Sequence, residues 1–325
     1  MHILVIGLGS MGKRRIRLIK AMNPEYQIIG VDSNTDRTGK VSEEYQITCV
    51  SSLESVTAEE ITCALVCTSP LSHADIITEC LKKGWHVFTE INLVADAYER
   101  NQQLAEKKGL TLFLSSTPVY RAEMRKIREK LQQNGRPVSY SYHVGQYLPD
   151  WHPWESFQQF FVGNKRTNGC REILAIELPW MGKAFGPIVS VQTITGKHTK
   201  LEIDYNDHYL IQIQHENGTH GVFIVDVVCR QAVRHLEIFN EDIYLEWNGT
   251  PDSLLWKNIE KNEMEKLSSD DAYAREAGYS AFVNEYAYVN ELKEFFEVME
   301  NGKQMAYTFE EDAEMLKWID RIEGK

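Results

Sequence analysis

Apolar and polar positions alternate in two different ways along the chain, with a change near residue 117. Before it, short apolar runs rich in β-branched residues are separated by amphipathic stretches with helical spacing, two of which end at Gly84 and Gly109 as glycine-capped helices do. The predicted strands are His2–Ile6, Gln27–Val31, Ile47–Val50, Thr62–Cys67, His86–Thr89 and Leu110–Leu114. Strands that alternate with helices predict a parallel, doubly wound α/β domain over residues 1–117.

After Pro118 the pattern changes to longer helices and to strands with one apolar face. Helices are predicted over about 121–134, 170–185, 282–300 and 308–322, and strands over about 138–147 and 188–248. Asn217-Gly218, between two alternating runs, predicts a hairpin. Residues 118–325 are therefore predicted to form an α+β domain, whose open, mainly antiparallel sheet is a meander flanked by helices. The polar residues 257–280 are predicted to be a long excursion, and the closing helices can pack back on the first domain.

The turn after the first strand carries the strongest chemical signal of the chain. Its sequence is Gly7-Leu-Gly9-Ser10-Met11-Gly12, and a basic helical stretch follows at once. In such a G-x-G-x-x-G turn the first glycine allows the tight turn, the second lets the backbone approach a pyrophosphate, and the third lets the helix pack closely on the strand. Unpaired N–H groups at the start of the helix then face the phosphate oxygens. The first domain is therefore predicted to be a Rossmann domain that binds a dinucleotide.

The acid at the end of the second predicted strand indicates which dinucleotide binds. Asp32 follows that strand, at the distance from the glycine turn that the dinucleotide fingerprint requires. A carboxylate there accepts hydrogen bonds from an adenosine ribose diol and repels a 2′-phosphate. NAD is therefore the expected cofactor, and Arg37 nearby leaves NADP as the less favoured alternative.

Composition and charge exclude several function classes. The formal net charge of −12 argues against nucleic acid or an anionic membrane surface as a partner. No apolar run approaches the roughly 18 residues that a membrane span needs. The six cysteines are scattered without a C-x-x-C pair, which favours reduced thiols, and no histidine pair has metal-ligand spacing. The first strand begins without a charged leader, so we expect a cytoplasmic protein without a metal.

Several motifs resemble those of the glucose–fructose oxidoreductase/inositol dehydrogenase (Gfo/Idh/MocA) family, which joins a Rossmann domain to an open antiparallel sheet. Thr68-Ser69-Pro70-Leu-Ser-His73 resembles the family's T-x-P-x-x-x-H turn, which lies over the nicotinamide. The stretch 81–87 with Glu90 resembles the run into its E-K-P motif, and Tyr120-Arg121 resembles the pair that opens its second domain. Residues 145–151 are similar to members from surface-sugar and nucleotide-sugar pathways.

The chain departs from the family at two positions that carry chemistry. The E-K-P triplet is Glu90-Ile91-Asn92, so isoleucine replaces the lysine that lies close to the reacting carbon in the family. The family often has D-x-x-x-H on a helix, and here Glu172 takes the aspartate position while Ile176 takes the histidine position. The resemblance still implies cofactor contacts from Thr68, Ser69, Pro70, His73, Glu90 and Asn92.

A buried carboxylate is the remaining candidate for proton transfer. Hydride transfer from an alcohol needs a base with a pKa near working pH, and burial raises the pKa of a carboxyl group. Glu172 is the first candidate, with Glu177 and His73 as possible partners, although a five-residue spacing separates Glu172 and Glu177 by about 140° around the helix. Alternatively, Glu172 caps the helix or pairs with Arg171 or Lys165, and His73 is an ordinary satisfied polar residue.

Aromatic and basic residues of the second domain are candidate substrate contacts. Aromatic rings stack on sugars, while basic groups bind phosphates. The candidates are Arg121, Tyr147, Trp151, His152, Lys165 and Arg166. Alternatively, the rings pack as an ordered loop and the basic residues form a solvated loop. Arg230 and Arg234 either bind a diphosphate or pair with Glu237 or Glu241.

Together the observations favour an NAD-dependent oxidoreductase that transfers a hydride at a ring carbon of a sugar or nucleotide-sugar-like polyol. Two alternatives stay open: an NAD-binding sensor or scaffold without dehydrogenase turnover, and an enzyme whose tightly held NAD supports a redox-neutral epimerisation or elimination. The sheet of the second domain has apolar residues on both faces, and we expect it to pair in a homodimer or homotetramer. These residues are Ile211, Ile213, Val222 and Ile224.

Overall fold

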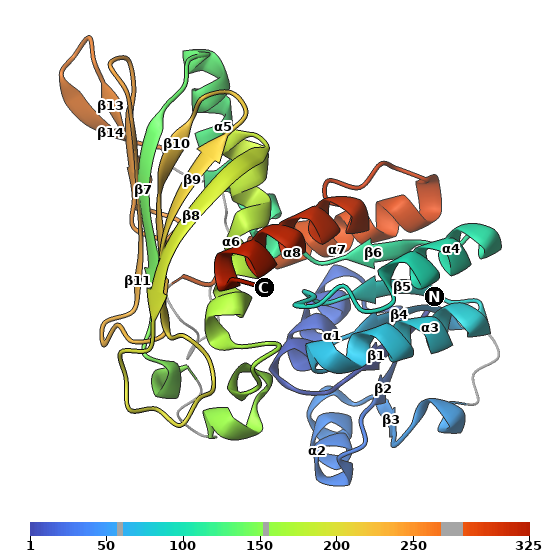
Figure 1. Cartoon of the computed structure of the whole chain (residues 1–325). Helices are drawn as coiled ribbons and strands as arrows, with labels where there is room; N and C mark the ends of the chain where they lie inside the picture. Colours follow the sequence, from blue (N-terminus) through green and yellow to red (C-terminus); the bar gives the residue numbers. More distant parts are fainter. Residues whose placement is uncertain (57–60, 152–155, 268–281) are drawn as a thin grey trace. The chain divides into compact units, whose positions relative to one another are not determined.

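The structure, a computed structural model, describes residues 1–56, 61–151, 156–267 and 282–325. The chain divides into two compact units, whose elements are labelled in Figure 1. Unit 1 consists of Met1–Ser115 and Glu291–Ala313, and unit 2 of Ser116–Asn290 and Glu314–Lys325. The closing helices α7 (Glu285–Asn301) and α8 (Phe309–Glu323) contribute residues to both units.

Unit 1 is built on a six-stranded parallel sheet with the order β3-β2-β1-β4-β5-β6. The strands are β1 (His2–Ile6), β2 (Gln27–Val31), β3 (Thr48–Val50), β4 (Ile61–Val66), β5 (His86–Thr89) and β6 (Leu112–Leu114). The helices between them are α1 (Ser10–Met22), α2 (Thr35–Tyr45), α3 (His73–Lys83) and α4 (Tyr98–Lys108). The strand order reverses direction between β1 and β4, where doubly wound folds bind dinucleotides. The predicted α/β fold of the first part is confirmed.

Buried aliphatic strands and glycine caps explain how unit 1 folds. The β1 residues 3–5 are fully buried, as expected for a strand covered on both faces. α3 and α4 end at Gly84 and Gly109, both with positive φ, as the sequence predicts. The C-terminal half of α7 packs against this sheet through Phe295, whose ring lies 5.5 Å from that of Phe88.

Unit 2 is built on an eight-stranded sheet with the order β14-β13-β12-β11-β7-β10-β9-β8. Its strands are β7 (Ser139–Gly145), β8 (Ile188–Gly196), β9 (His208–His215), β10 (His220–Asp226), β11 (Val233–Phe239), β12 (Tyr244–Trp247), β13 (Leu255–Asn258) and β14 (Glu263–Lys266). Helices α5 (Ala122–Asn134) and α6 (Gly169–Phe185) pack against each other, and α6 packs against β9 and β10. The predicted mainly antiparallel sheet with flanking helices is confirmed.

The order of the strands in this sheet differs from the predicted meander. β7 lies between β10 and β11, and it pairs parallel with β10. The hairpin at Asn217-Gly218 is confirmed, with only Gly218 at positive φ, so a three-residue loop ends in a glycine bulge. Within the predicted polar excursion, residues 257–258 and 263–266 belong to a hairpin that extends the sheet through β13 and β14. Residues 268–280 of the predicted excursion lie outside the described residues.

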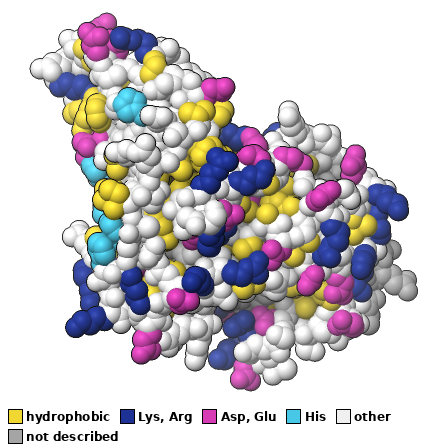
Figure 2. Space-filling model, viewed as in Figure 1, with side chains coloured by type: hydrophobic (Ala, Val, Ile, Leu, Met, Phe, Trp, Pro, Cys, Tyr) yellow, Lys and Arg dark blue, Asp and Glu magenta, His cyan; other side chains and the backbone are white. Residues whose placement is uncertain are grey.

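One face of the eight-stranded sheet is packed by helices, while the other carries apolar side chains and histidines outward. On the packed face the rings of Tyr140 and Phe185 stack, and Tyr142 meets Trp180 edge to face. On the open face Ile194 is 71% exposed, and Figure 2 shows yellow and cyan side chains along this side of unit 2. No helix in the described ranges has the length and apolar character needed to cross a membrane.

Candidate functional site

The three glycines of the turn after β1 have three different environments. Gly7 has φ of 90°, and a Cβ on it would lie 2.7 Å from the carbonyl oxygen of Cys67. A Cβ on Gly12 would collide with the carbonyl oxygen of Gly7, since α1 and the turn pack directly on each other. A Cβ on Gly9 meets no atom within 4 Å. The open space therefore lies at the glycine that the fingerprint places against the pyrophosphate.

The start of α1 has the features of a phosphate site. Gly9 is its N-cap and supplies no capping side chain, and the first turn contains no acidic residue. Ser10 is exposed and Met11 half-buried. The N–H groups of this first turn carry the positive end of the helix dipole, which favours a bound anion. The described residues of unit 1 thus fit a dinucleotide at this turn.

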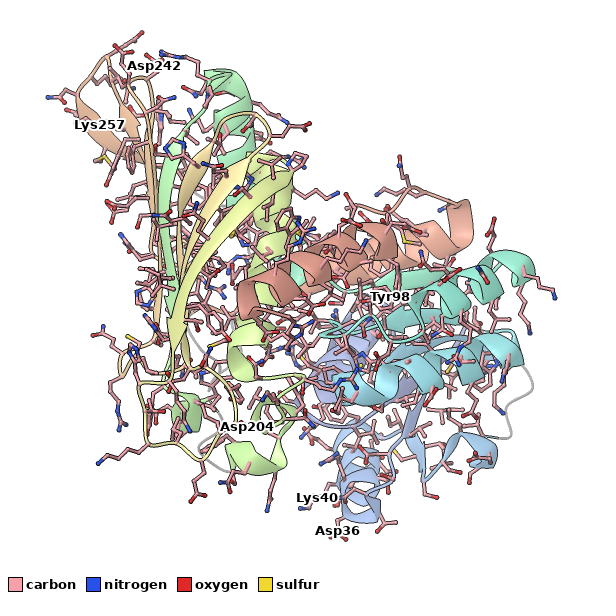
Figure 3. All side chains as sticks on the ribbon, in the orientation of Figure 1. Asp36, Lys40, Tyr98, Asp204, Asp242 and Lys257 are labelled. Carbon is pink, nitrogen blue, oxygen red and sulfur yellow. The ribbon has the colours of Figure 1, made fainter. Side chains whose placement is uncertain are left out.

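Asp32 holds the glycine turn while keeping an oxygen available for a ligand. Its Oδ2 accepts hydrogen bonds from the Leu8 N–H at 2.8 Å and from Arg37 Nη1 at 3.0 Å. Its Oδ1 accepts one from the Asn34 N–H at 2.9 Å. A carboxylate oxygen accepts two hydrogen bonds, so Oδ1 retains capacity for a ribose hydroxyl. Arg37 is half-exposed, and on the same helix Asp36 and Lys40 lie at the outer edge of unit 1 (Figure 3).

Glu90, which the resemblance places at the cofactor, belongs to a buried ion-pair network in unit 1. Arg15 Nε lies 2.6 Å from Glu90, and its Nη2 lies 2.7 Å from Glu291 of α7. Burial opposes the charge of Arg15, but the two carboxylates outweigh it and raise the Arg15 pKa. The guanidinium also lies over the Phe88 ring. Glu90 therefore joins α1, β5 and α7, and Ile91 beside it is half-buried.

His73 is buried and uses both ring nitrogens inside unit 1. Nδ1 lies 2.7 Å from the Asn92 side chain, and Nε2 lies 3.0 Å from the Thr68 carbonyl oxygen. Burial lowers the His73 pKa, so the ring is neutral at pH 7 and carries one N–H. The carbonyl of Thr68 only accepts, so Nε2 carries the proton and donates to it, while Nδ1 lies beside Asn92 Oδ1. His73 therefore fixes the turn that precedes α3 and has no free nitrogen for a substrate proton.

The rest of that turn is held in the same way. Pro70 is buried and starts a short 3₁₀ turn, while Ser69 is exposed. The Ser72 hydroxyl donates to Thr68 Oγ1 at 2.8 Å. Thr68, Pro70, His73 and Asn92 are thus brought together, as the resemblance implies.

Glu172 is a carboxyl group without a partner among the described residues. It lies in the first turn of α6, and its Oε2 is buried with no hydrogen bond. The neighbours that the sequence offered are taken elsewhere: Arg171 pairs with Asp320 and Glu323, and Lys165 with Asp204. Burial raises the pKa of Glu172 to about 8. The group can hold and release a proton near neutral pH.

Unlike Glu172, Glu177 has hydrogen-bond partners for both of its carboxylate oxygens. One oxygen accepts hydrogen bonds from the Tyr142 hydroxyl at 2.7 Å and from Trp180 Nε1 at 2.6 Å. The other lies 2.5 Å from Arg234 Nη2. With both oxygens bound inside unit 2, Glu177 connects α6 to the sheet and is not available as a proton carrier.

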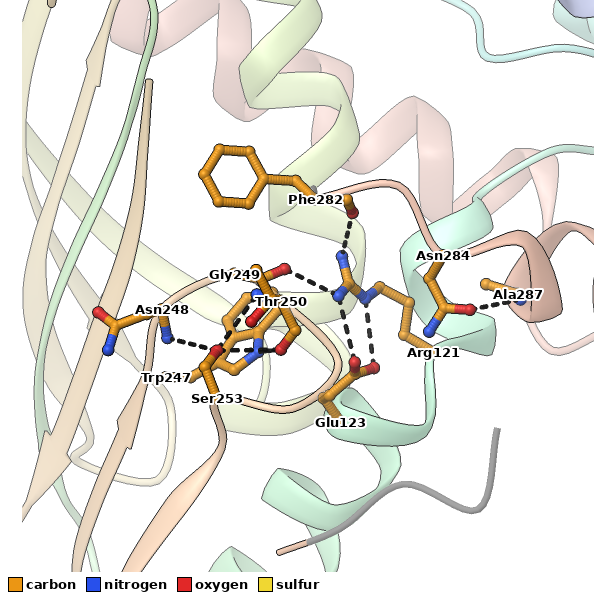
Figure 4. A network of polar contacts seen from close by, with 10 residues as sticks. All are labelled: Arg121, Glu123, Trp247, Asn248, Gly249, Thr250, Ser253, Phe282, Asn284 and Ala287. Carbon is orange, nitrogen blue, oxygen red and sulfur yellow. Dashed lines mark hydrogen bonds and ion pairs between the residues drawn. The ribbon is translucent and has the colours of Figure 1, made fainter. Parts of the chain in front are cut away.

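Arg121 likewise makes its contacts inside unit 2 (Figure 4). It is buried and forms a two-point ion pair with Glu123. It also donates to the carbonyl oxygens of Gly249 and Phe282, each at 3.0 Å. The guanidinium lies over the Trp247 ring. Arg121 therefore holds the start of α5 against the loop after β12, and four of its five N–H groups are used in doing so.

Four other predicted substrate residues, Tyr147, Trp151, Lys165 and Arg166, belong to the segment between the end of β7 and the start of α6 (Figure 1). Trp151 donates from Nε1 to the Gln146 carbonyl oxygen. Lys165 pairs with Asp204, which is labelled in Figure 3, and both side chains are exposed. Arg166 is exposed and has interactions of its own. His152 lies outside the described residues.

Three residues of the site region were not recognised from the sequence: Arg15, Glu291 and Asp312. Arg15 and Glu291 are 276 positions apart. Asp312 accepts hydrogen bonds from Tyr98 at 2.5 Å and from Tyr307 at 3.0 Å. No local pattern marks such pairs, because their partners come from the far end of the chain.

Comparisons with known proteins agree with this geometry. Residues 1–116 match the Gfo/Idh/MocA family model, described as an oxidoreductase family with an NAD-binding Rossmann fold. Over 114 residues the chain is 29% identical to human biliverdin reductase A, an alignment that covers 34% of this chain and only 38% of that protein. The family resemblance inferred from the motifs is thereby confirmed.

Solved structures match the whole chain in fold. Levoglucosan dehydrogenase in complex with NADH superposes with a TM-score of 0.83 at 14% identity, covering 100% of this chain and 96% of that one. The WlbA dehydrogenase of Bordetella pertussis, in complex with NADH and UDP-GlcNAcA, superposes with a TM-score of 0.77 at 14% identity, covering 99% and 95%. The likeness extends the fold assignment through unit 2.

Proposed function

Residues 1–116 match the Gfo/Idh/MocA oxidoreductase family model. From this premise we propose that the protein is an NAD-dependent oxidoreductase that acts on a CH–OH group of a sugar or nucleotide-sugar-like polyol. The observation that carries the proposal is the carboxyl group of Glu172, whose buried Oε2 has no hydrogen bond and whose pKa is raised to about 8 by desolvation. A base poised near the working pH suits removal of a hydroxyl proton. Levoglucosan dehydrogenase and WlbA, whose folds this chain has, support the substrate class.

Unit 1 supplies the cofactor residues in this proposal. The Gly7–Gly12 turn and the start of α1 receive the pyrophosphate, and Asp32 receives the adenosine ribose. When bound, the nicotinamide accepts or returns a hydride. The turn that His73 and Asn92 fix provides the backbone beside it, so His73 acts as a positioning residue.

Unit 2 supplies the proton acceptor. In its ionised form Glu172 removes the proton from the substrate hydroxyl while the hydride leaves the carbon, and in its neutral form it returns the proton in the reverse direction. Ile91 and Ile176 stand where the family's lysine and histidine would assist. Glu172 therefore works without them, and Glu177 takes no part.

The proposal has three further parts. The substrate is a small molecule, the protein is located in the cytoplasm, and it assembles as a homodimer or homotetramer through the sheet of unit 2. The match to biliverdin reductase A covers only 34% of this chain and 38% of that protein, so it does not carry a proposal of biliverdin as the substrate. The loss of the lysine and the histidine supports a second candidate, NAD-binding without net dehydrogenase turnover.

A screen for NADH formation tests the proposed function. Purified protein with NAD is offered free sugars and nucleotide sugars, and any hit is repeated with Glu172→Gln. We expect kcat to rise with pH up to about 8, and the variant to lose at least ~10²-fold in kcat with NAD affinity unchanged. Turnover that survives Glu172→Gln would remove Glu172 as the base. NAD binding with no turnover across the screen would favour the second candidate.

The choice of NAD over NADP has its own measurement. Asp32 repels a 2′-phosphate, so NAD should bind more tightly than NADP, and Asp32→Ser should narrow the gap. Calorimetric titration of both dinucleotides against both proteins decides it. Tighter binding of NADP to the native protein would contradict the proposal, because Arg37 would then face the phosphate rather than Asp32.

A further inference from the structure

Most of the basic side chains that could bind an anionic substrate in unit 2 are already paired. Arg121 and Arg171 are buried, Arg234 is half-buried, and all three form ion pairs with carboxylates. Lys165 faces Asp204. Arg230, in the loop between β10 and β11, is exposed and has no carboxylate partner among the described residues.

Arg230 is nevertheless held in one place. Its guanidinium carbon lies 3.6 Å from the centroid of the Tyr147 ring. A guanidinium stacked on an aromatic ring keeps its N–H groups in the plane of the stack, pointing outward. Arg230 is therefore a planar, charged donor whose face is covered and whose edge is open.

The backbone that carries this pair is rigid. The Tyr147 N–H donates to the Cys229 carbonyl oxygen at 2.7 Å. Asp226 Oδ1 accepts from the N–H groups of Val228 and Cys229, at 2.9 and 2.7 Å, and Oδ2 lies 2.7 Å from His143 Nε2. Burial opposes the ionised form of Asp226, but these hydrogen bonds outweigh it and lower its pKa. The loop is thus fixed by a buried carboxylate.

A glycine makes room for that carboxylate. A Cβ on Gly145 would lie 2.4 Å from Asp226 Oδ2, so only glycine at this position lets the side chain reach His143. The loop that carries Arg230 therefore depends on a glycine at position 145 as well as on Asp226 and His143.

The segments that follow β7 and β10 also contact the first turn of α6, which carries Glu172. The Leu148 N–H donates to the Val227 carbonyl oxygen at 3.0 Å. A Cβ on Gly169 would lie 3.0 Å from Val227 and 3.5 Å from the Trp151 ring, so both pack on the first turn of α6. Glu172 follows Gly169 by three residues, which places it on the same side of the helix. Arg230, Trp151 and the proposed base are thus parts of one corner of unit 2.

We propose that this corner binds a sugar that carries an anionic substituent, with Arg230 as the residue that selects it. The inference rests on the proposed function, since it places the substrate beside Glu172. A guanidinium edge pairs in two-point fashion with a carboxylate or a phosphate oxygen pair. The arrangement therefore favours uronic acids, sugar phosphates or nucleotide-linked sugars over neutral sugars.

Matched pairs of sugars test the inference by calorimetry on the NAD-saturated protein. The pairs are glucose with glucuronic acid, glucose with glucose 6-phosphate, and glucose with UDP-glucose. We expect at least one anionic member to bind ~10-fold or more tightly than its neutral counterpart, and the three pairs separate a carboxylate from a phosphate as the recognised group. Arg230→Gln should abolish the preference, whereas Tyr147→Leu should weaken it and Tyr147→Phe should keep it. Arg125→Gln, an exposed arginine on α5, is the control for charge alone.

The binding and turnover readouts separate the two proposals. One outcome is that the native protein prefers the anionic sugars, loses that preference in Arg230→Gln, and forms no NADH with any pair. That result would support the binding site and contradict the oxidoreductase. NADH formation with equal kcat/KM for Arg230→Gln and native protein would support the oxidoreductase and overturn the role of Arg230. Equal affinity for the neutral and anionic members of every pair overturns the inference, and so does the absence of binding by any of them.

Discussion

The three glycines after β1 illustrate how one residue type serves three physical needs. Gly7 requires a positive φ, and Gly12 leaves no volume for a side chain. Gly9 has a negative φ and free space around it, so the fold does not require glycine there. The motif could be identified from the sequence because each need depends on neighbours only a few residues away.

Gly9→Val separates cofactor binding from folding. The added side chain enters space that the protein leaves empty, so the melting temperature should stay close to that of the native protein. It should also block the pyrophosphate and lower NAD affinity at least ~10-fold, equivalent to about 1.4 kcal/mol. Calorimetry and a melting curve measure the two effects. Gly12→Val is the contrast, because it should lower the melting temperature itself; unchanged NAD affinity in Gly9→Val would refute the assignment.

The carboxyl of Glu172 makes a prediction about stability that does not depend on any substrate. Its pKa is about 8 when folded and ~4.3 when unfolded. Between these values the unfolded chain loses the proton while the folded chain keeps it, so stability falls as pH rises from about 4.5 to about 8 and then levels off. Glu172→Gln removes this loss.

Melting curves at several pH values check this. The melting temperature of Glu172→Gln relative to the native protein should increase from pH 5 to pH 8, because all other groups titrate alike in both proteins. A difference that does not change with pH would mean that the carboxyl is solvated or paired. The orphan oxygen could not have been inferred from the sequence, since Arg171 and Lys165 beside it were equally plausible partners.

At the scale of elements, α6 combines two carboxylates with opposite roles on different sides of one helix. The five-residue spacing predicts that they point apart, and their contacts differ: Glu177 binds Tyr142 of β7 and Arg234 of β11, whereas Oε2 of Glu172 has no hydrogen bond. Tyr142 and Arg234 decide which of the two carboxylates binds to the sheet. The sequence does not predict that the strands of these two residues pair.

Breaking the Glu177 network should destabilise unit 2. Glu177→Gln leaves Arg234 buried without its counter-ion, and such losses cost about 3–5 kcal/mol of unfolding free energy. Glu314→Gln on α8 is a matched control, because its pair with Lys317 is exposed and should contribute no more than about 1 kcal/mol. Urea titrations of the three proteins give the comparison. Equal losses in both variants would show that the Glu177 network is not a structural one.

The strands show where sequence reasoning ends. Their positions follow from local alternation, and most observed bounds lie within a few residues of the predicted ones. Their order does not, because β7 inserts between β10 and β11 through contacts with residues about 80 to 100 positions away. Neither the parallel β7–β10 pair nor the corner formed by the loops after those two strands has a local signature.

At the scale of the whole molecule, the part of the open sheet face formed by β7 to β10 has few charged groups. On β7, β8, β9 and β10 the only charged outward residue is Asp226, and it is bound to His143. The other outward positions are Ser139, Ser141, Gly145, Ser190, Gln192, Ile194, Gly196, His208, Leu210, Gln212, Gln214, His220, Val222 and Ile224. Depletion of charge with exposed aliphatic groups is typical of the core of a protein interface, and a sheet face is well suited to pairing with a copy of itself.

We therefore expect a homodimer or a larger even assembly, held by this face. Val222 lies centrally on it, and Val222→Glu would bury two unpaired carboxylates across a two-fold axis, which should shift the protein to monomers. Lys40→Gln, on α2 of unit 1, changes the net charge by the same amount and should leave the assembly intact. Light scattering at micromolar concentration gives the mass of each protein. A native monomer would rule out the interface, and an assembly that tolerates Val222→Glu would place it on another surface.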